Sequence, residues 1–129
     1  MTGSAAVSDR VDRGQATVEL VLVLPLVVLL SLLVVQVALL ARAQVLVTHA
    51  AREGARAAAV DPVPAAARAA AEAGAPLDPA RLDVRFEGGH ASGDRVAVEV
   101  RYRVATDVAL VGPLVPDLVI GAVATMRVE

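Results

Sequence analysis

A glycine and a glutamate mark the point where a short polar N-terminal stretch gives way to an apolar one. Gly14 ends the polar residues 1–14, and Glu19 is the one carboxylate within the start of the apolar run. A carboxylate without a partner is costly to bury in an apolar environment, so Glu19 is a functional candidate. The sequence therefore places its most informative chemistry between Gly14 and Glu19.

The rest of the chain offers little that a catalyst needs. Cysteine is absent, which excludes disulfides and zinc–thiolate sites. The tail holds one histidine, His90, and no nucleophile–base pair or paired acids, while His49 has no second metal ligand nearby. We therefore expect no enzyme, no cofactor and no metal site. All 12 basic residues are Arg, and the net charge of -2 gives no general attraction to nucleic acid.

One uncharged block dominates the composition, which is 57% hydrophobic. It runs from Leu20 to Ala41 and would span about 33 Å as a helix, enough to cross a bilayer core of about 30 Å. We predict a single membrane-spanning helix, kinked at Pro25, with the lipid bilayer as its surroundings. Ser31 and Gln36 either mark a face that touches another helix or are tolerated without a partner.

Two other fates of the N-terminus are open. The sequence Ala41-Arg42-Ala43 has the A-x-A form of a signal-peptidase site, and cleavage there would release a small secreted domain that begins at Gln44. The apolar stretch before it is longer than a signal peptide requires. Alternatively, the leader is never removed, and the apolar helix is an ordinary signal anchor.

Two motifs together resemble one protein family. The first, RGQATVELVLVLP at residues 13–25, is similar to the processing site of type IV prepilins and pseudopilins. The second is AAREGAR, which follows the apolar block. With both motifs, the chain resembles the TadE-like family of pseudopilins, which belongs to the tight-adherence (Flp, type IVc) pilus system of bacteria. The second motif consists of Ala50, Ala51, Arg52, Glu53, Gly54, Ala55 and Arg56.

This resemblance implies a processing event and a role. A prepilin peptidase would cut on the cytoplasmic side after Gly14, so that Gln15 becomes the first residue and Glu19 the fifth. The new amine would lie one helical turn from Glu19 of its own chain, or Glu19 would meet the amine of a neighbouring subunit and set its register. The implied function is that of a minor pseudopilin in assembly or anchoring of the pilus.

The resemblance also implies partners and a location. The partners are the prepilin peptidase, other pseudopilins, the Flp-type pilin and the pilus membrane platform. The protein would cross the cytoplasmic membrane once, with a cytoplasmic N-terminus and an extracytoplasmic C-terminal domain. The alternative is an uncleaved, single-pass, membrane-anchored envelope binding protein.

Helical character continues beyond the apolar block, because no proline occurs until Pro62. A helix over residues 15–60 would be a stalk about 69 Å long. Gly54 suits a close helix contact, and Glu53 can pair with Arg56. Four basic residues share one face of this stalk, either to bind anionic headgroups or an acidic partner or simply to be solvated; they are Arg42, His49, Arg52 and Arg56.

The remaining sequence predicts a small β-rich domain and an α+β fold class. Residues 61–81 form a Pro/Ala-rich linker with a short helix from Ala65 to Ala73. Within residues 82–129, apolar and polar residues alternate over 82–87, 96–104 and 118–128, which predicts a three-stranded antiparallel sheet with helical cover on its apolar face. The apolar loop 108–116 either contacts a membrane or subunit or tucks under the sheet.

Overall fold

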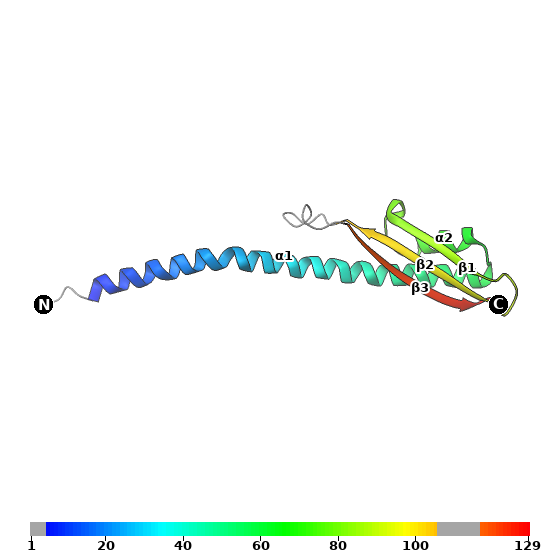
Figure 1. Cartoon of the computed structure of the whole chain (residues 1–129), viewed down its shortest axis with the longest axis horizontal. Coiled ribbons are helices and arrows are strands. Elements are labelled where there is room, and N and C mark those ends of the chain that lie inside the picture. Colours follow the sequence, from blue (N-terminus) through cyan, green and yellow to red (C-terminus); the bar gives the residue numbers. More distant parts are fainter. Residues whose placement is uncertain (1–4, 106–116) are drawn as a thin grey trace. The chain divides into compact units, whose positions relative to one another are not determined.

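A computed structural model describes residues 5–105 and 117–129, with side chains described at residue 15 and from residue 17 onward. The fold is α+β, as predicted: a long helix is followed by a short helix, a turn of 3-10 helix and three strands (Figure 1). The chain divides into two compact units, Met1–Val37 and Ala38–Glu129.

Helix α1 runs over Ala5–Val60, 56 residues, and contains Pro25. It begins ten residues before the predicted start at Gln15, because the sequence from Ala5 to Gly14 has no proline and only one glycine to interrupt a helix. Residues 5–14 of the predicted leader and the predicted processing site therefore lie in the same helix as the apolar span. The predicted end at Val60 is confirmed.

Strands β1 (Leu82–Gly88), β2 (Arg95–Val104) and β3 (Leu118–Arg127) form one antiparallel sheet in the order β1-β2-β3. Apolar residues face one another across the strands, as in the pairs Val84↔Val100 and Val98↔Ala124. The predicted turn between β1 and β2 contains Gly88 and Gly93 with φ of 148° and 88°, a region that L side chains rarely adopt.

Two helices cover the apolar face of the sheet. The part of α1 after Ala38 packs under it, and α2 (Pro64–Ala73) contacts β1. Both helices present small side chains, whereas the central strand presents valines. The fully buried core residues at or near zero exposure are Val47, Ala50, Ala51, Ala55, Ala58, Ala67, Ala71, Val96, Val98 and Val100. The apolar loop 108–116 lies outside the described residues.

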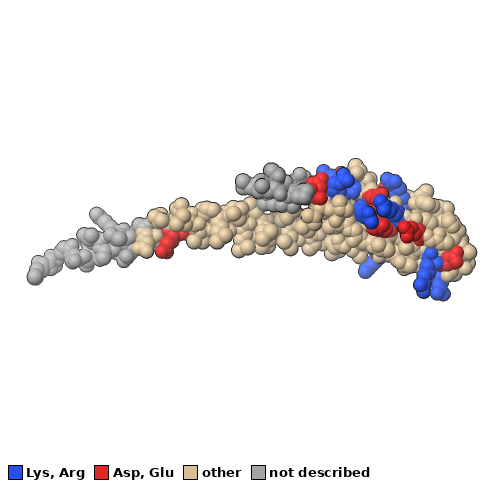
Figure 2. Space-filling model, viewed as in Figure 1, with Lys and Arg blue, Asp and Glu red and all other residues tan. Residues whose placement is uncertain are grey.

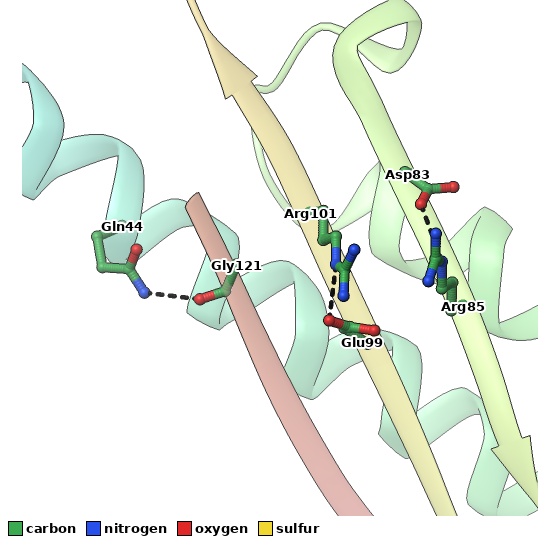
Figure 3. Close-up of polar contacts among 6 residues, drawn as sticks. All are labelled: Gln44, Asp83, Arg85, Glu99, Arg101 and Gly121. Atoms are coloured by element: carbon green, nitrogen blue, oxygen red, sulfur yellow. Dashed lines mark hydrogen bonds and ion pairs between the residues drawn. The ribbon is translucent and has the colours of Figure 1, made fainter. Parts of the chain in front are cut away.

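The opposite face of the sheet is charged and exposed. Arg85 pairs with Asp83 at 3.2 Å, and Arg101 pairs with Glu99 at 2.7 Å (Figure 3). Figure 2 shows acidic and basic side chains gathered in mixed groups in this part of the molecule. Exposed pairs of this kind contribute little to stability, so the fold rests on the valine and alanine core.

Candidate functional site in the long helix

The residues of the predicted processing site follow one another within helix α1. Gln15 and Glu19 are separated by four residues in a continuous helix, so they lie on the same face one turn apart. Both side chains are exposed, and no ion-pair partner of Glu19 occurs among the described residues. The backbone at Gly14 is also helical. The structure thus supports the spacing that a charge pair between a Gln15 amine and Glu19 requires.

The apolar block forms the part of α1 that follows Glu19. Within Thr17–Val60 its most apolar window has a mean hydropathy of 3.0, and none of that window is buried in the protein. Large side chains point outward all around the helix, with Leu22 72% and Leu29 55% exposed. The helix is therefore long and apolar enough to cross a membrane, and its surface is matched to hydrocarbon instead of water.

The two polar residues inside this block differ. The Ser31 hydroxyl donates a hydrogen bond to the Val27 carbonyl at 2.8 Å, so its polarity is satisfied within the helix. The Oε1 atom of Gln36 is buried and has no hydrogen-bond partner among the described residues. Of the two, only Gln36 has a side-chain oxygen that lacks a hydrogen-bond partner among the described residues, and its role stays a prediction.

The AAREGAR motif lies where α1 meets α2 and β2. At most 1% of the surface of Ala50, Ala51 or Ala55 is exposed. A Cβ atom at Gly54 would lie 3.0 Å from the Ala67 carbonyl oxygen and 3.0 Å from a methyl group of Val98. The predicted close helix contact at Gly54 is therefore confirmed, and the small residues of the motif are needed for packing.

The two arginines of the motif do not take part in this packing, whereas Glu53 lies against the residue that follows α2. Arg52 and Arg56 are exposed, and Glu53 is half-buried beside Gly74, where an added Cβ would lie 3.0 Å from the Cβ and Cγ of Glu53. The predicted Glu53–Arg56 pair is wrong: no such ion pair forms in the described part of the chain, because Glu53 turns toward α2.

The predicted basic face of the stalk is present. Its four members are all exposed, and none has a carboxylate partner among the described residues. Val45, 68% exposed, lies among them on the same face. Whether this face binds an acidic group or is simply solvated stays a prediction. The four residues are Arg42, His49, Arg52 and Arg56.

Two hydrogen bonds that the sequence did not predict fasten the edge of the sheet to α1. The Gln44 side-chain Nε2 donates to the Gly121 carbonyl oxygen at 3.1 Å (Figure 3). The backbone N–H of Glu129 donates to the Ala59 carbonyl oxygen at 3.0 Å. The two contacts join residues far apart in sequence, and nothing in local periodicity indicates them. Together they fasten β3 and the residues after it to the helix at two points.

The comparison with protein families agrees with the residues described above. A family model described as TadE-like protein matches residues 14–56, which include Gly14, Glu19, the apolar span and the AAREGAR motif. The predicted resemblance is thus confirmed for this segment. No curated protein and no solved structure matched the chain.

Proposed function

Because residues 14–56 form a TadE-like segment, we propose that this chain is a minor pseudopilin of the tight-adherence pilus system. The observation that carries the proposal is the placement of Gln15 and Glu19 one turn apart at the start of a fully exposed apolar helix. In this proposal a prepilin peptidase cleaves after Gly14, and the mature protein stays in the membrane through α1. Its C-terminal unit then lies outside the cytoplasm.

Gly14 suits a cleavage site in a helix. The peptide bond after it must leave the helix to enter a peptidase active site, and every residue that unwinds loses a helical hydrogen bond. Glycine inside a helix is less favourable than alanine by about 1 kcal/mol, so Gly14 lowers the free energy of local unwinding. A bulky side chain there would also obstruct access to the bond that is cut.

Glu19 acquires a partner only when the chain is cut. Cleavage creates an ammonium group at Gln15, and a carboxylate one turn later can pair with it inside one chain. In an assembly, Glu19 of one subunit can instead pair with the amine of its neighbour. A charge at the edge of an apolar span is costly alone and acceptable when paired, so this pairing favours one axial register between adjacent helices.

The proposal assigns an assembly role and no catalysis to the chain. Its partners would be the prepilin peptidase, other pseudopilins, the Flp-type pilin and the pilus membrane platform. The exposed apolar span supplies the surface that packs against lipid and against neighbouring helices, with Gln36 as a polar contact between helices. The packed unit after Ala38 is then free to contact partners outside the membrane.

Substitution of Gly14 tests the processing step. Gly14→Leu, expressed in the native host, should leave the chain uncut, so that the membrane protein migrates at the mass of the unprocessed chain. Gly3→Leu introduces the same side chain elsewhere in the leader and should be cut normally. Normal cleavage of Gly14→Leu would rule out this processing site.

Substitution of Glu19 tests the assembly step separately. Glu19→Ala should still be cut and inserted, but it should reduce the number of pili per cell by about tenfold, since a lost charge pair worth about 1.4 kcal/mol changes an equilibrium tenfold. Glu19→Asp keeps the charge and should retain part of the function. Wild-type piliation in Glu19→Ala would show that this carboxylate has no role in assembly.

One observation favours the alternative of an uncleaved membrane anchor. Helix α1 continues without a break from Ala5 through Gly14 into the apolar span, so the leader is not separated from it by a change of backbone conformation. An uncleaved envelope binding protein would have the same anchor and would use the C-terminal unit as its binding domain. The Gly14→Leu variant distinguishes the two, because only the pseudopilin depends on cleavage.

A further inference from the structure

A cavity of about 270 Å³ lies beside the part of α1 where the apolar block ends. Three segments form its walls: α1 itself, the residues between α2 and β1, and the end of β2. The side chains from α1 are spaced by one to four residues along one face of the helix. They are Leu39, Arg42, Ala43 and Leu46. All of the residues that line the cavity belong to the compact unit Ala38–Glu129.

The shape of the cavity is set by the packing of the domain. Leu46, Leu77 and Tyr102 line it and also pack against the buried core, so they have little freedom to move. The volume lies just below the roughly 300 Å³ at which sites for small molecules begin. The cavity is therefore suited to a small group, such as the polar end of a larger molecule.

Two arginines give the cavity a positive charge, because none of its lining residues in the described part of the chain is acidic. Arg42 is exposed and has no ion-pair partner among the described residues. The Nε atom of Arg81 is 3.6 Å from Oδ2 of Asp78, which is too far for a hydrogen bond. The Asp78 carboxylate accepts a hydrogen bond from the Ala80 N–H at 3.0 Å instead. Both guanidinium groups can therefore donate to an anion.

The cavity coincides with the boundary between apolar and charged residues on α1. Leu39 is within the uncharged block Leu20–Ala41, and Arg42 is the first charged residue after it. The two residues are three positions apart, about 4.5 Å along the helix axis. A span in a bilayer places this boundary at the headgroups, where the polar ends of arginine and tyrosine are favourable. Tyr102 lines the same cavity, so its lining is matched to this interface.

We propose that this cavity binds the headgroup phosphate of an anionic phospholipid, with the acyl chains beside Leu39 and the apolar block. The planar fork of an arginine matches the oxygen atoms of a phosphate, and Arg42 and Arg81 together compensate its charge. A zwitterionic headgroup also carries an ammonium group, for which the described lining residues offer no carboxylate. We therefore expect a preference for phosphatidylglycerol over phosphatidylcholine.

The lipid site rests on the membrane anchorage of the proposed function but not on cleavage after Gly14. An uncleaved chain that begins at Met1 would contradict the processing step alone, since the span and the cavity would be unchanged. A chain that fails to enter lipid nanodiscs would contradict both the proposed function and the lipid site. A chain that enters them without a preference for the anionic lipid would contradict only the lipid site.

Tyr102 is the single tyrosine of the chain, so it provides a probe at the cavity. The full chain would be labelled with fluorotyrosine and placed in phosphatidylcholine nanodiscs that contain increasing fractions of phosphatidylglycerol. The fluorine resonance should shift and then saturate as the site fills. Soluble glycerol phosphate at the same total concentration should leave it unchanged, because only the lipid is held beside the site by its acyl chains. An unchanged resonance with the lipid, or an equal shift with glycerol phosphate, would overturn the proposal.

Two double variants with the same net charge separate this site from general attraction to an anionic surface. Arg42→Gln with Arg81→Gln should weaken phosphatidylglycerol binding about twentyfold, since each arginine near an anionic membrane contributes roughly fivefold. Arg56→Gln with Arg95→Gln removes two exposed arginines that do not line the cavity, and binding should change little. Equal weakening in the two double variants would contradict a specific site.

Filling the cavity without a change of charge tests where the lipid binds. Ala43→Leu places a larger side chain in the lining and should abolish the saturable shift of the fluorine resonance. Ala41→Leu adds the same side chain at an exposed position outside the lining, and it should bind like the native chain. Circular dichroism checks that both variants are folded. A folded Ala43→Leu that binds phosphatidylglycerol as well as Ala41→Leu does would contradict binding in this cavity.

Discussion

The two units of the chain contain the same kinds of apolar residue but differ in how much of their surface is exposed. In the apolar span, Leu22 and Leu29 are more than half exposed to the surroundings of the described residues. In the C-terminal unit, Val96, Val98 and Val100 of β2 are completely buried between the sheet and two helices. The first unit needs an external apolar environment, and the second provides its own.

One helix serves both units because its side chains change in size along its length. The span is rich in leucine and valine, which give it a wide apolar surface. From Ala50 to Ala59 the same helix is mostly alanine with Gly54, so its backbone can approach α2 and β2 closely. The difference shows that side-chain size, and not helix formation, separates the part of α1 that packs against protein from the part whose apolar surface is exposed.

The largest contrast should come from placing a charge in each part of α1. Leu29→Arg puts a charge at the centre of the span, where insertion costs about 3 kcal/mol, and should move most of the protein out of the membrane fraction. Val45→Arg changes a similarly exposed residue beyond the span and should remain membrane-bound. Carbonate extraction and immunoblotting measure both. Equal extraction of the two variants would show that the two parts of α1 do not differ in their need for a membrane.

The packing at Gly54 should be the next most sensitive feature. Gly54→Val forces side-chain atoms into a space where even a Cβ lies 3.0 Å from Ala67 and Val98, and overpacking of this kind costs about 2 kcal/mol. The melting temperature of the full chain in detergent, followed by circular dichroism of the sheet, should fall by about 10 °C. Ala69→Val on the exposed face of α2 should shift it little. A stable Gly54→Val would mean that the helices are not in close contact.

The link between α1 and β3 should have a smaller effect. Gln44→Leu keeps the size of the side chain but removes the donor to the Gly121 carbonyl, a change worth about 1 kcal/mol or less. Hydrogen exchange should become faster near Gly121 and stay unchanged in β1. Thr48→Val is the control, since the Thr48 hydroxyl bonds only within α1, to the Gln44 carbonyl. If hydrogen exchange became faster in β1 by as much as in β3, the effect of Gln44 would not be limited to its bond with β3.

The smallest effect should come from the surface of α2. Arg68 donates to Glu72 at 2.8 Å, but both side chains are partly exposed, so the pair should contribute less than about 0.5 kcal/mol. A double-mutant cycle with Arg68→Ala and Glu72→Ala, followed by thermal unfolding, measures this coupling. A coupling energy as large as the effect of Gly54→Val would contradict a domain stabilised by its apolar core.

Much of the fold is predictable from local sequence patterns. The uncharged block predicted the span, and the alternation around Val98 predicted the strands and their apolar face. The change from polar to apolar residues predicts a helix that begins at Gln15, whereas α1 begins at Ala5. Helix formation depends on backbone propensity, which does not change at that point.

The contacts between distant residues were not predictable in the same way. The sequence indicates a pair between Glu53 and Arg56, but Glu53 lies against Gly74, the residue that caps the C-terminus of α2. It gave no sign of the bonds from Gln44 to Gly121 and from Glu129 to Ala59, which depend on how β3 lies along α1. The spacing of Gly14 and Glu19 could be interpreted from the sequence alone, because the charge pair that it predicts joins residues about one helical turn apart.

The N-terminus of the mature protein tests the central claim most directly. Intact mass and N-terminal sequencing of the protein purified from its native membrane should show a chain that begins at Gln15. A chain that begins at Met1 or Thr2 would identify an uncleaved anchor, and one that begins at Gln44 would identify a released domain. Either result would contradict the proposal that this is a pseudopilin processed after Gly14.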